Sequence, residues 1–291
     1  MTAAVLPPAI IAQELTWNLP DAGRVLCYHR PGAGRPLLLL HSINAAPSAF
    51  EVSPFFDRLS LDRPLYAPDL PGFGRSARTD RPYRPEFFAT AIQQMIDAIG
   101  ADSVDVLALS TTSEFAARAA LREPERIASL VLVSPTGLSR RRDEPSKAGP
   151  KVLRVFRTPG VGSTLYRLLR TRPSIRFFLD KAFEDGAPDA MVDYACRTTR
   201  VPGASNAPFY FLSGQMFAPD AVGDLYLPLK QPVLVLYDQD PNISFDYLDQ
   251  VLEEGRAWQA ERIPGTRGLP HFEKPAATQR ALETFWRRLD E

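Results

Sequence analysis

Residues 103–124, SVDVLALSTTSEFAARAALREP, join a predicted strand to a predicted helix with almost no loop between them. The first part, ending at Ser110, is rich in Val and Leu, as expected for a strand buried in a parallel sheet. The second part is rich in alanine and stops at Pro124, as expected for a helix. A sharp turn between them predicts that Ser110 projects above the sheet at a helix N-terminus, where backbone N–H groups stabilise negative charge.

The same alternation of strand and helix continues on both sides of this stretch. Short apolar runs separated by helical patterns predict an α/β fold, with a mostly parallel central sheet and flanking helices. The further predicted strands are 24–29, 35–42, 63–70, 127–135, 231–239 and 258–264. The further predicted helices are 48–59, 85–100, 244–254 and 274–290.

Residues 139–222 have a different character, since they contain several short helical patterns and no strong strand run. We therefore predict a core of residues 1–138 and 223–291, with residues 139–222 inserted as a helical cap. Residues 140–200 carry 14 Lys and Arg against 7 Asp and Glu. This excess indicates either a solvated helical face or a surface that attracts anionic groups or a membrane.

The composition excludes several classes of protein. The 291 residues carry no net charge, whereas binding to nucleic acid requires a basic surplus. Cys27 and Cys196 match no metal-binding or redox spacing, so we expect free thiols, no metal site and no cofactor. Apolar runs such as 37–40 are far too short to span a membrane, and the N-terminus lacks the basic start of a signal peptide. The sequence therefore predicts a cytoplasmic protein.

Ser110 can be interpreted as a catalytic nucleophile or simply as the N-cap of the following helix. Where a strand turns sharply into a helix around a nucleophile, glycines are favoured two residues before and two after it, because the backbones nearly touch. Here Ala108 and Thr112 occupy those positions. We expect Ala108 to fit, and Thr112 to crowd the turn unless the helix shifts slightly.

Residues 37–50, LLLLHSINAAPSAF, predict a strand end followed by a loop of small residues. Such a loop can aim backbone N–H groups at a developing oxyanion, and Ile43 and Thr111 would be the two donors. His41 stands where the strand ends, and we expect it to hold the loop by hydrogen bonds rather than to act in catalysis.

The acid and the base are expected near the carboxyl ends of later strands. Asp238 and Asp240 directly follow a predicted strand, and either could orient a histidine or shape the turn before Pro241; we favour Asp240. His271 is the only histidine after them, in a loop before the last helix. The order along the chain is then nucleophile, acid and base.

Three further stretches resemble the α/β-hydrolase-fold family, and the resemblance covers nearly the whole chain. They are LLLLHSINAAPSAFE (37–51), LYAPDLPGFGRS (65–76) and PERIASLVLVSPTG (124–137). In the second, the family pattern Asp-x-Pro-Gly-x-Gly-x-Ser is matched by Asp69, Pro71, Gly72, Gly74 and Ser76. The resemblance implies a capped hydrolase fold with a triad of Ser110, Asp240 and His271. It also implies that the base stands seven residues before Pro275, which is Gly268, so that His271 matches a companion histidine three residues later.

We therefore expect a serine hydrolase of a small or medium ester or acyl compound, with a divergent triad and a small, apolar acyl substrate as its partner. The alternatives are an impaired family member that binds a hydrophobic or anionic ligand, and a lyase or transferase that uses the same pocket. Five cap aromatics could line that pocket or merely pack the cap: Phe177, Phe178, Phe209, Tyr210 and Phe211.

Overall fold

One eight-stranded sheet organises the computed structural model, which describes residues 6–140, 148–158 and 160–290. The strands lie in the order β1-β2-β4-β3-β5-β6-β7-β8. Their bounds are β1 (Gln13–Leu19), β2 (Gly23–Arg30), β3 (Leu37–Leu40), β4 (Leu65–Pro68), β5 (Val104–Leu109), β6 (Ile127–Val133), β7 (Val233–Tyr237) and β8 (Trp258–Arg262). β2 pairs antiparallel with β1 and with β4, and every other pairing is parallel, which confirms the predicted α/β fold with a mostly parallel sheet.

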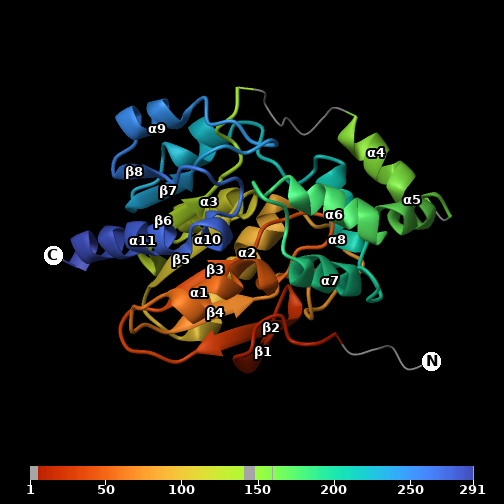
Figure 1. The fold of residues 1–291 in the computed structure, drawn as a ribbon, viewed down its shortest axis with the longest axis horizontal. Coiled ribbons are helices and arrows are strands. Elements are labelled where there is room, and N and C mark those ends of the chain that lie inside the picture. The colour runs from red at the N-terminus through yellow and green to blue at the C-terminus, as the bar shows by residue number, and fades with distance from the viewer. Residues whose placement is uncertain (1–5, 141–147, 159, 291) are drawn as a thin grey trace.

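Both faces of the sheet are buried. Successive residues of each strand point to opposite sides, and each side is covered by its own apolar cluster. Leu38, Val106 and Leu130 pair across β3, β5 and β6, and they belong to one apolar cluster. Leu107 and Val131, the next residues along β5 and β6, belong to the other. The first cluster includes side chains of α2 (Pro85–Ile99), α3 (Thr112–Arg122) and α9 (Leu248–Glu254). The second includes side chains of α1 (Ser53–Arg58) and α11 (Pro275–Asp290) (Figure 1).

Helix α2 shows how local sequence sets an element of this core. Pro85 occupies the first turn, where its missing N–H costs nothing. Gly100 ends the helix at φ 76°, and its N–H bonds the carbonyls of Ile96 and Asp97. Phe88 and Ile92, on the same side of the helix, are fully buried against the sheet. The predicted helix 85–100 is confirmed.

Three elements differ from expectation, one of which is α10 (Pro270–Glu273), a short helix where a loop was predicted. β1 was not predicted, because its polar and exposed residues give no apolar run, and only antiparallel pairing with β2 makes it a strand. The predicted helix 244–254 begins only at Leu248. Before it, Ser244 donates a hydrogen bond to Asp246, which also accepts the Arg140 N–H, and this local turn competes with helix.

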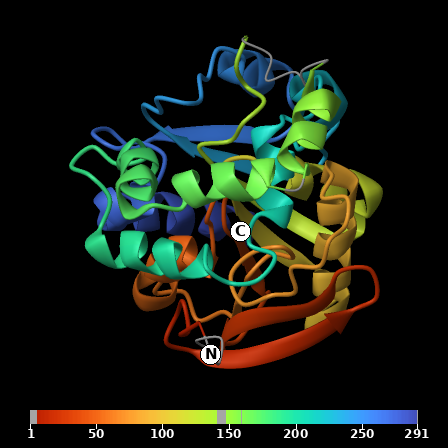
Figure 2. The ribbon, with the colours of Figure 1, turned by 90° about the vertical axis from the view of Figure 1, so that its right-hand side faces the viewer.

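Between β6 and β7 the chain runs through a helical insertion that contains the predicted cap. Its helices are α4 (Gly149–Phe156), α5 (Val161–Leu169), α6 (Arg172–Asp180), α7 (Asp189–Thr198) and α8 (Asn206–Leu212), followed by a π-helical turn at Val222–Tyr226. Figures 1 and 2 show these helices gathered on one side of the molecule. Tyr166, Ala204 and Phe209 form a small apolar cluster within the insertion. Side chains of α7 instead join the core cluster that contains α1.

The Asp-Leu-Pro-Gly-Phe-Gly turn after β4 is built around a buried carboxylate. Asp69 accepts hydrogen bonds from the backbone N–H groups of Ala49 at 2.9 Å and Arg75 at 2.8 Å. Burial raises the pKa of Asp69, and these hydrogen bonds partly oppose that shift. Gly74 has φ 47°, and a Cβ on it would lie 2.0 Å from Asp69 Cγ. Glycine is therefore required here both by the backbone conformation and by the carboxylate.

We expect Gly74→Ala to destabilise the fold by about 3 kcal/mol or more, because left-handed backbone strain adds to displacement of a buried, hydrogen-bonded carboxylate. The matched control is Gly34→Ala, since Gly34 has φ 83° but no atom within 4 Å of the position that the added methyl group would occupy. That control should lose only the stability that corresponds to backbone strain, about 1 kcal/mol. Urea unfolding measures both, and equal losses would contradict the role given to the Asp69 turn.

Candidate active site

Ser110 lies on a strained turn between β5 and α3. Its φ is 52°, in the left-handed region that residues other than glycine seldom adopt. The Ser110 N–H still donates to Val133 O at 2.9 Å, so the turn begins while the strand is paired to β6. The side chain is only partly buried, whereas every residue of β5 is buried. This is the backbone geometry that presents a nucleophile above a sheet.

Thr112, which was expected to crowd the turn, is accommodated by a hydrogen bond. Its hydroxyl donates to His41 O at 2.6 Å, and its side chain is fully buried. The first residue of α3 is therefore attached to the end of β3. Thr112, which stands where the motif favours glycine, thus links the start of α3 to the residue that follows β3.

The two backbone N–H groups that were predicted to stabilise an oxyanion have no hydrogen-bond acceptor in the described structure. Neither Ile43 N–H nor Thr111 N–H has an acceptor in the part of the chain that the structure describes. Thr111 precedes the first turn of α3, where N–H groups have no partner within the helix. The Thr111 hydroxyl is buried and also has no partner among the described residues. An unpaired buried hydroxyl costs about 1–3 kcal/mol, and it is expected where a ligand completes a site.

His41 holds the loop after β3, as predicted. Its Nε2 accepts the Leu70 N–H at 2.9 Å, so the proton is on Nδ1, which donates to Ser42 O at 2.7 Å. The ring is fully buried, and burial lowers its pKa to about 4. His41 is therefore neutral near pH 7, and both of its ring nitrogens are occupied by backbone groups.

Glu51 is a residue of this site that sequence reasoning missed. Its buried carboxylate accepts the Ser42 N–H at 2.8 Å and the Asn44 side-chain amide at 2.9 Å. Burial raises the pKa of Glu51, and these hydrogen bonds partly oppose the shift. The Ser42 N–H is occupied in this way, whereas the Ile43 N–H has no acceptor in the described structure. The position of Glu51 within the helical pattern 48–59 gave no signal of this role.

The two candidate acids have different surroundings. Asp238 accepts hydrogen bonds from Arg262, Gly265 and Thr266, which outweigh its burial and lower its pKa. Asp240 has no cationic partner within ion-pair distance among the described residues, and burial raises its pKa. Its Oδ2 lies 2.9 Å from the point that a Cβ on Gly268 would occupy. Asp240 thus faces the residue at which the motif alignment expects the base.

His271 lies in α10 (Pro270–Glu273), buried, with its ring stacked on Phe55 at a centroid distance of 4.5 Å. Its Nε2 donates to Glu51 O at 2.6 Å, and its Nδ1 has no hydrogen-bond partner in the described residues. Burial lowers its pKa to about 4. Within the described chain, no hydrogen bond connects His271 to Ser110 or to Asp240.

The other histidine of the chain, His29, contacts Leu65 O at 3.1 Å. All three histidines of the sequence are therefore occupied by backbone carbonyls. In the described structure Ser110 lies on a strained turn, the Ile43 and Thr111 N–H groups have no acceptor, and Asp240 faces Gly268.

Ser134, at the end of β6, is a second strained serine that sequence reasoning missed. Its φ is 44°, and its buried hydroxyl has no hydrogen-bond partner among the described residues. The Ser110 N–H donates to the carbonyl oxygen of Val133, which is the last residue of β6. Ser110 and Ser134 therefore directly follow two neighbouring strands, β5 and β6. A serine before Pro135 is a common turn signal, so nothing in the sequence distinguished it.

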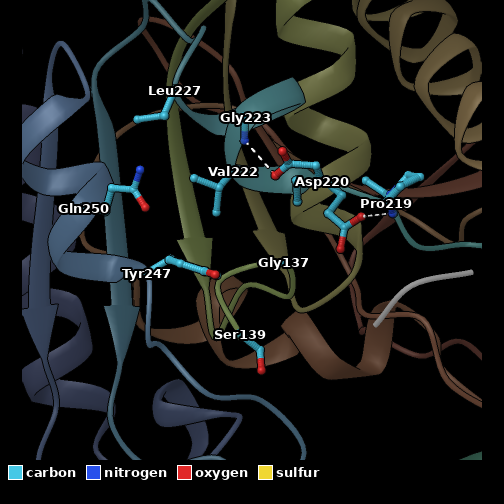
Figure 3. A pocket seen from close by; sticks show the side chains of 12 residues that line it. Gly137, Ser139, Pro219, Asp220, Val222, Gly223, Leu227, Tyr247 and Gln250 are labelled. Atoms are coloured by element: carbon cyan, nitrogen blue, oxygen red, sulfur yellow. Dashed lines mark hydrogen bonds between the residues drawn. The ribbon is translucent and has the colours of Figure 1, made fainter. Parts of the chain in front are cut away.

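A cavity of about 220 Å³ lies at the base of the insertion, beside α3 (Figure 3). Gly137 and Ser139, which lead into the insertion, border it, as do residues 218–223, which lead out. Figure 3 shows Tyr247 and Gln250 on one side and Asp220 and Val222 on the other. Ser110 is not among its lining residues.

The predicted pocket aromatics divide into two groups. Phe209 and Tyr210 are buried and Phe211 is half-buried, all in α8. Phe177 and Phe178 in α6 are 58% and 53% exposed. The expectation that these last two line a pocket or pack the cap is wrong, because the inner side of α6 is taken by Ile175 and both phenylalanines point outward.

Cys27 and Cys196 are free thiols, as predicted, although only Cys27 is fully buried. Among the described residues, no cluster of three or more His, Cys, Asp or Glu side chains could hold a metal ion. No helix in that part of the chain is long and apolar enough to cross a bilayer.

Solved structures with this fold cover nearly the whole chain. The epoxide hydrolase CorEH superposes with a TM-score of 0.76 at 17% identity, covering 95% of this chain and 99% of that one. The esterase EaEST from Exiguobacterium antarcticum gives a TM-score of 0.73 at 14% identity, covering 94% of this chain and 99% of its own. At such low identity these likenesses establish the fold.

Curated relatives match part of the chain. The 1-acylglycerol-3-phosphate O-acyltransferase ABHD5 of Rattus norvegicus is 32% identical over 126 residues, 42% of this chain and 35% of that protein. The 2-hydroxymuconate semialdehyde hydrolase of Pseudomonas sp. (strain CF600) is 31% identical over 134 residues, 42% of this chain and 46% of that protein. The human (Lyso)-N-acylphosphatidylethanolamine lipase is 32% identical over 116 residues, 38% of this chain and 33% of that protein. The chain thus spans less than half the length of these relatives.

The model of the alpha/beta hydrolase family matches residues 37–281, which include β3 through the first part of α11 and therefore all residues of the candidate site. This match agrees with the sheet order, the strained serine after β5 and the helical insertion between β6 and β7. The chain belongs to the alpha/beta hydrolase family.

Proposed function

We propose that this chain is a serine hydrolase that acts slowly on a small or medium acyl ester, with Ser110 as the nucleophile. The observation that carries the proposal is the left-handed φ of 52° at Ser110, at the junction of a buried strand and a helix N-terminus. Strain of this kind costs about 1–3 kcal/mol, and it persists where function requires it. In the proposed reaction Ser110 Oγ attacks the ester carbonyl and the alcohol leaves, and water then releases the acid.

Ile43 and Thr111 would stabilise the oxyanion that forms in this attack. Their N–H groups flank the strand ends joined by the Thr112–His41 hydrogen bond, and both are free in the described structure. Donors fixed before the reaction stabilise developing charge without reorganisation. Glu51 and His41 act as positioning residues, because they hold the loop that carries Ile43.

The proposal assigns the acid position to Asp240 and leaves the base position, Gly268, without a side chain. A histidine at that position would lie beside Asp240. The Ser110 proton must then pass to water or to the substrate. Loss of the base lowers the rate of a serine hydrolase by several orders of magnitude, so slow turnover is expected.

The lack of a side chain at Gly268 also favours a second candidate function, which is binding of an acyl ligand without turnover. Asp240 faces Gly268 with no imidazole to orient, which suits a site kept for recognition. The names of two relatives, an acylglycerol-phosphate acyltransferase and an N-acylphosphatidylethanolamine lipase, support an acyl compound as the ligand in either case. Covalent reactivity of Ser110 separates the two functions.

A fluorophosphonate probe should label the wild-type protein slowly and at one serine: Ser110 Oγ bonds to phosphorus, fluoride leaves, and the hydroxyl proton passes to water. Ser110→Ala should abolish the labelling. Ser134→Ala is the matched control, since Ser134 is also strained and lies at the end of the neighbouring strand; it should label like the wild type. Intact-protein and peptide mass spectrometry locate the adduct. Absence of an adduct, together with no turnover of short or long acyl esters, would leave only the binding function.

We expect His271→Gln to change stability rather than reactivity. Below about pH 6.5 an unfolded chain protonates this histidine, whereas the folded protein keeps it neutral down to about pH 4. Acidification from pH 7 to 5 therefore favours unfolding, and the variant should lose less stability than the wild type across this window. Melting temperatures measure the difference, and Ser110 labelling at pH 7 should stay within a few-fold of wild type. Complete loss of labelling in the folded variant would make His271 the base.

A further inference from the structure

Exposed apolar side chains are concentrated on the helical insertion. Seven large apolar side chains are exposed in the described residues, and six of them lie on its helices. Leu168 on α5 is 65% exposed, and Phe177 and Phe178 on α6 are 58% and 53% exposed. The others are Val155, Val161 and Leu212. A soluble surface has single apolar residues scattered over it, so a cluster confined to one region indicates a contact surface.

The exposed residues lie on helices whose inner sides are already packed. Tyr166 on α5 and Ile175 on α6 are buried against the rest of the protein, while Val161 and Leu168, two turns apart on α5, are exposed. These helices therefore carry apolar residues on two sides, of which the protein itself covers one. Figure 1 shows α4, α5 and α6 on the side of the molecule away from the C-terminal end of α11.

The same segment is strongly basic. Residues 149–181 contain eight Lys and Arg but only one acidic residue, Asp180. Arg157, Arg172 and Arg176 are paired with carboxylates. The remaining five have no carboxylate partner among the described residues: Lys151, Arg154, Arg167, Arg170 and Lys181. Lys181 Nζ lies 4.5 Å from the ring centroid of Phe177 and 5.6 Å from that of Phe178, so a cation stands directly over the exposed rings.

We propose that this surface, the docking face, binds an anionic lipid bilayer. It is defined by Arg154, Val155, Arg167, Leu168, Phe177 and Phe178. Apolar side chains would enter the acyl boundary, while the surrounding guanidinium and ammonium groups would meet lipid phosphates. A second copy of the chain fits less well, because a symmetric pair would bring two basic faces together.

The docking face is connected to the candidate site through the end of α6. Ala182, four residues after Phe178, has its Cβ 3.6 Å from the point that a Cβ on Gly268 would occupy. Just beyond, the Glu184 carboxylate accepts a hydrogen bond from Arg267 at 2.8 Å, and the Glu184 N–H donates to Glu273 at 2.6 Å. A bilayer under α6 would therefore lie beside the loop that borders Asp240. If the proposed hydrolase function holds, its substrate class is a lipid-derived acyl ester taken from that bilayer.

Vesicle flotation tests the docking face directly. The full chain is mixed with vesicles of phosphatidylcholine alone, or of phosphatidylcholine with phosphatidylglycerol as the minor lipid, at low and high salt. We expect binding to the anionic vesicles only, weakened by salt. The double variant Arg154→Glu, Arg167→Glu should lower the partition coefficient by about 25-fold or more, since each basic residue contributes roughly five-fold. Phe177→Ser with Phe178→Ser should lower it by at least about ten-fold.

The matched controls lie on the core. Arg256→Glu with Arg280→Glu reverses two exposed cations there, and Ile11→Ser removes the seventh exposed apolar side chain. Both should bind like wild type, and thermal melts establish that every variant is folded. Ser110→Ala should also bind like wild type, so vesicle binding is measured independently of hydrolysis.

Three results would overturn the proposal. The first is no wild-type flotation with anionic vesicles, and the second is equal flotation with both vesicle types. The third is self-association in sedimentation velocity that the Phe177 and Phe178 variant abolishes without any vesicle binding, which would assign the face to a second copy. Failure of ester turnover alone would contradict only the inference that the substrate is a lipid-derived acyl ester, and not the binding of the docking face to a bilayer.

Discussion

The left-handed backbone at Ser110 is the constraint on which the site depends. A residue at φ 52° persists only if its surroundings fix it, and here two hydrogen bonds do so. Ser110 N–H stays paired to Val133 O on β6, and the hydroxyl of Thr112 is bonded to His41 O on β3. Because β3 and β6 are the parallel neighbours of β5, the sheet itself holds the turn. The free Ile43 and Thr111 N–H groups follow from the same arrangement.

The candidate site has no side chain at the position where the family motif expects the base. Asp240, whose pKa burial raises, faces Gly268 at that position, and each of the three histidines is bonded to a backbone carbonyl. His271 joins α10 to Glu51, whose carboxylate in turn holds the Ser42 N–H. Its burial supports the loop that carries Ile43. One histidine therefore stabilises the oxyanion side of the site, while the base side has no side chain.

Local signals predicted most of the fold and indicated Ser110 and Asp240 as candidate site residues. Apolar runs located the buried strands, and the carboxyl ends of parallel strands brought Ser110, Ile43 and Asp240 to one edge of the sheet. β1 was missed because its pairing is tertiary and its residues are polar. Glu51 was missed because a carboxylate in a helical pattern is usually solvated, and only the folded loop turns it toward Ser42. Phe177 and Phe178 were misplaced because both sides of α6 carry apolar residues.

The central claim is that Ser110 is a presented nucleophile whose base position is Gly268. The pH dependence of acylation at Ser110, measured for wild type and Gly268→His, tests it most directly. The Cβ of the new side chain requires Asp240 to shift, because Asp240 Oδ2 is 2.9 Å from that position. The account predicts a flat wild-type profile between about pH 5.5 and 7.5, and a faster variant with an inflection near 6.5. A wild-type inflection in that range, abolished by His271→Gln, would contradict it.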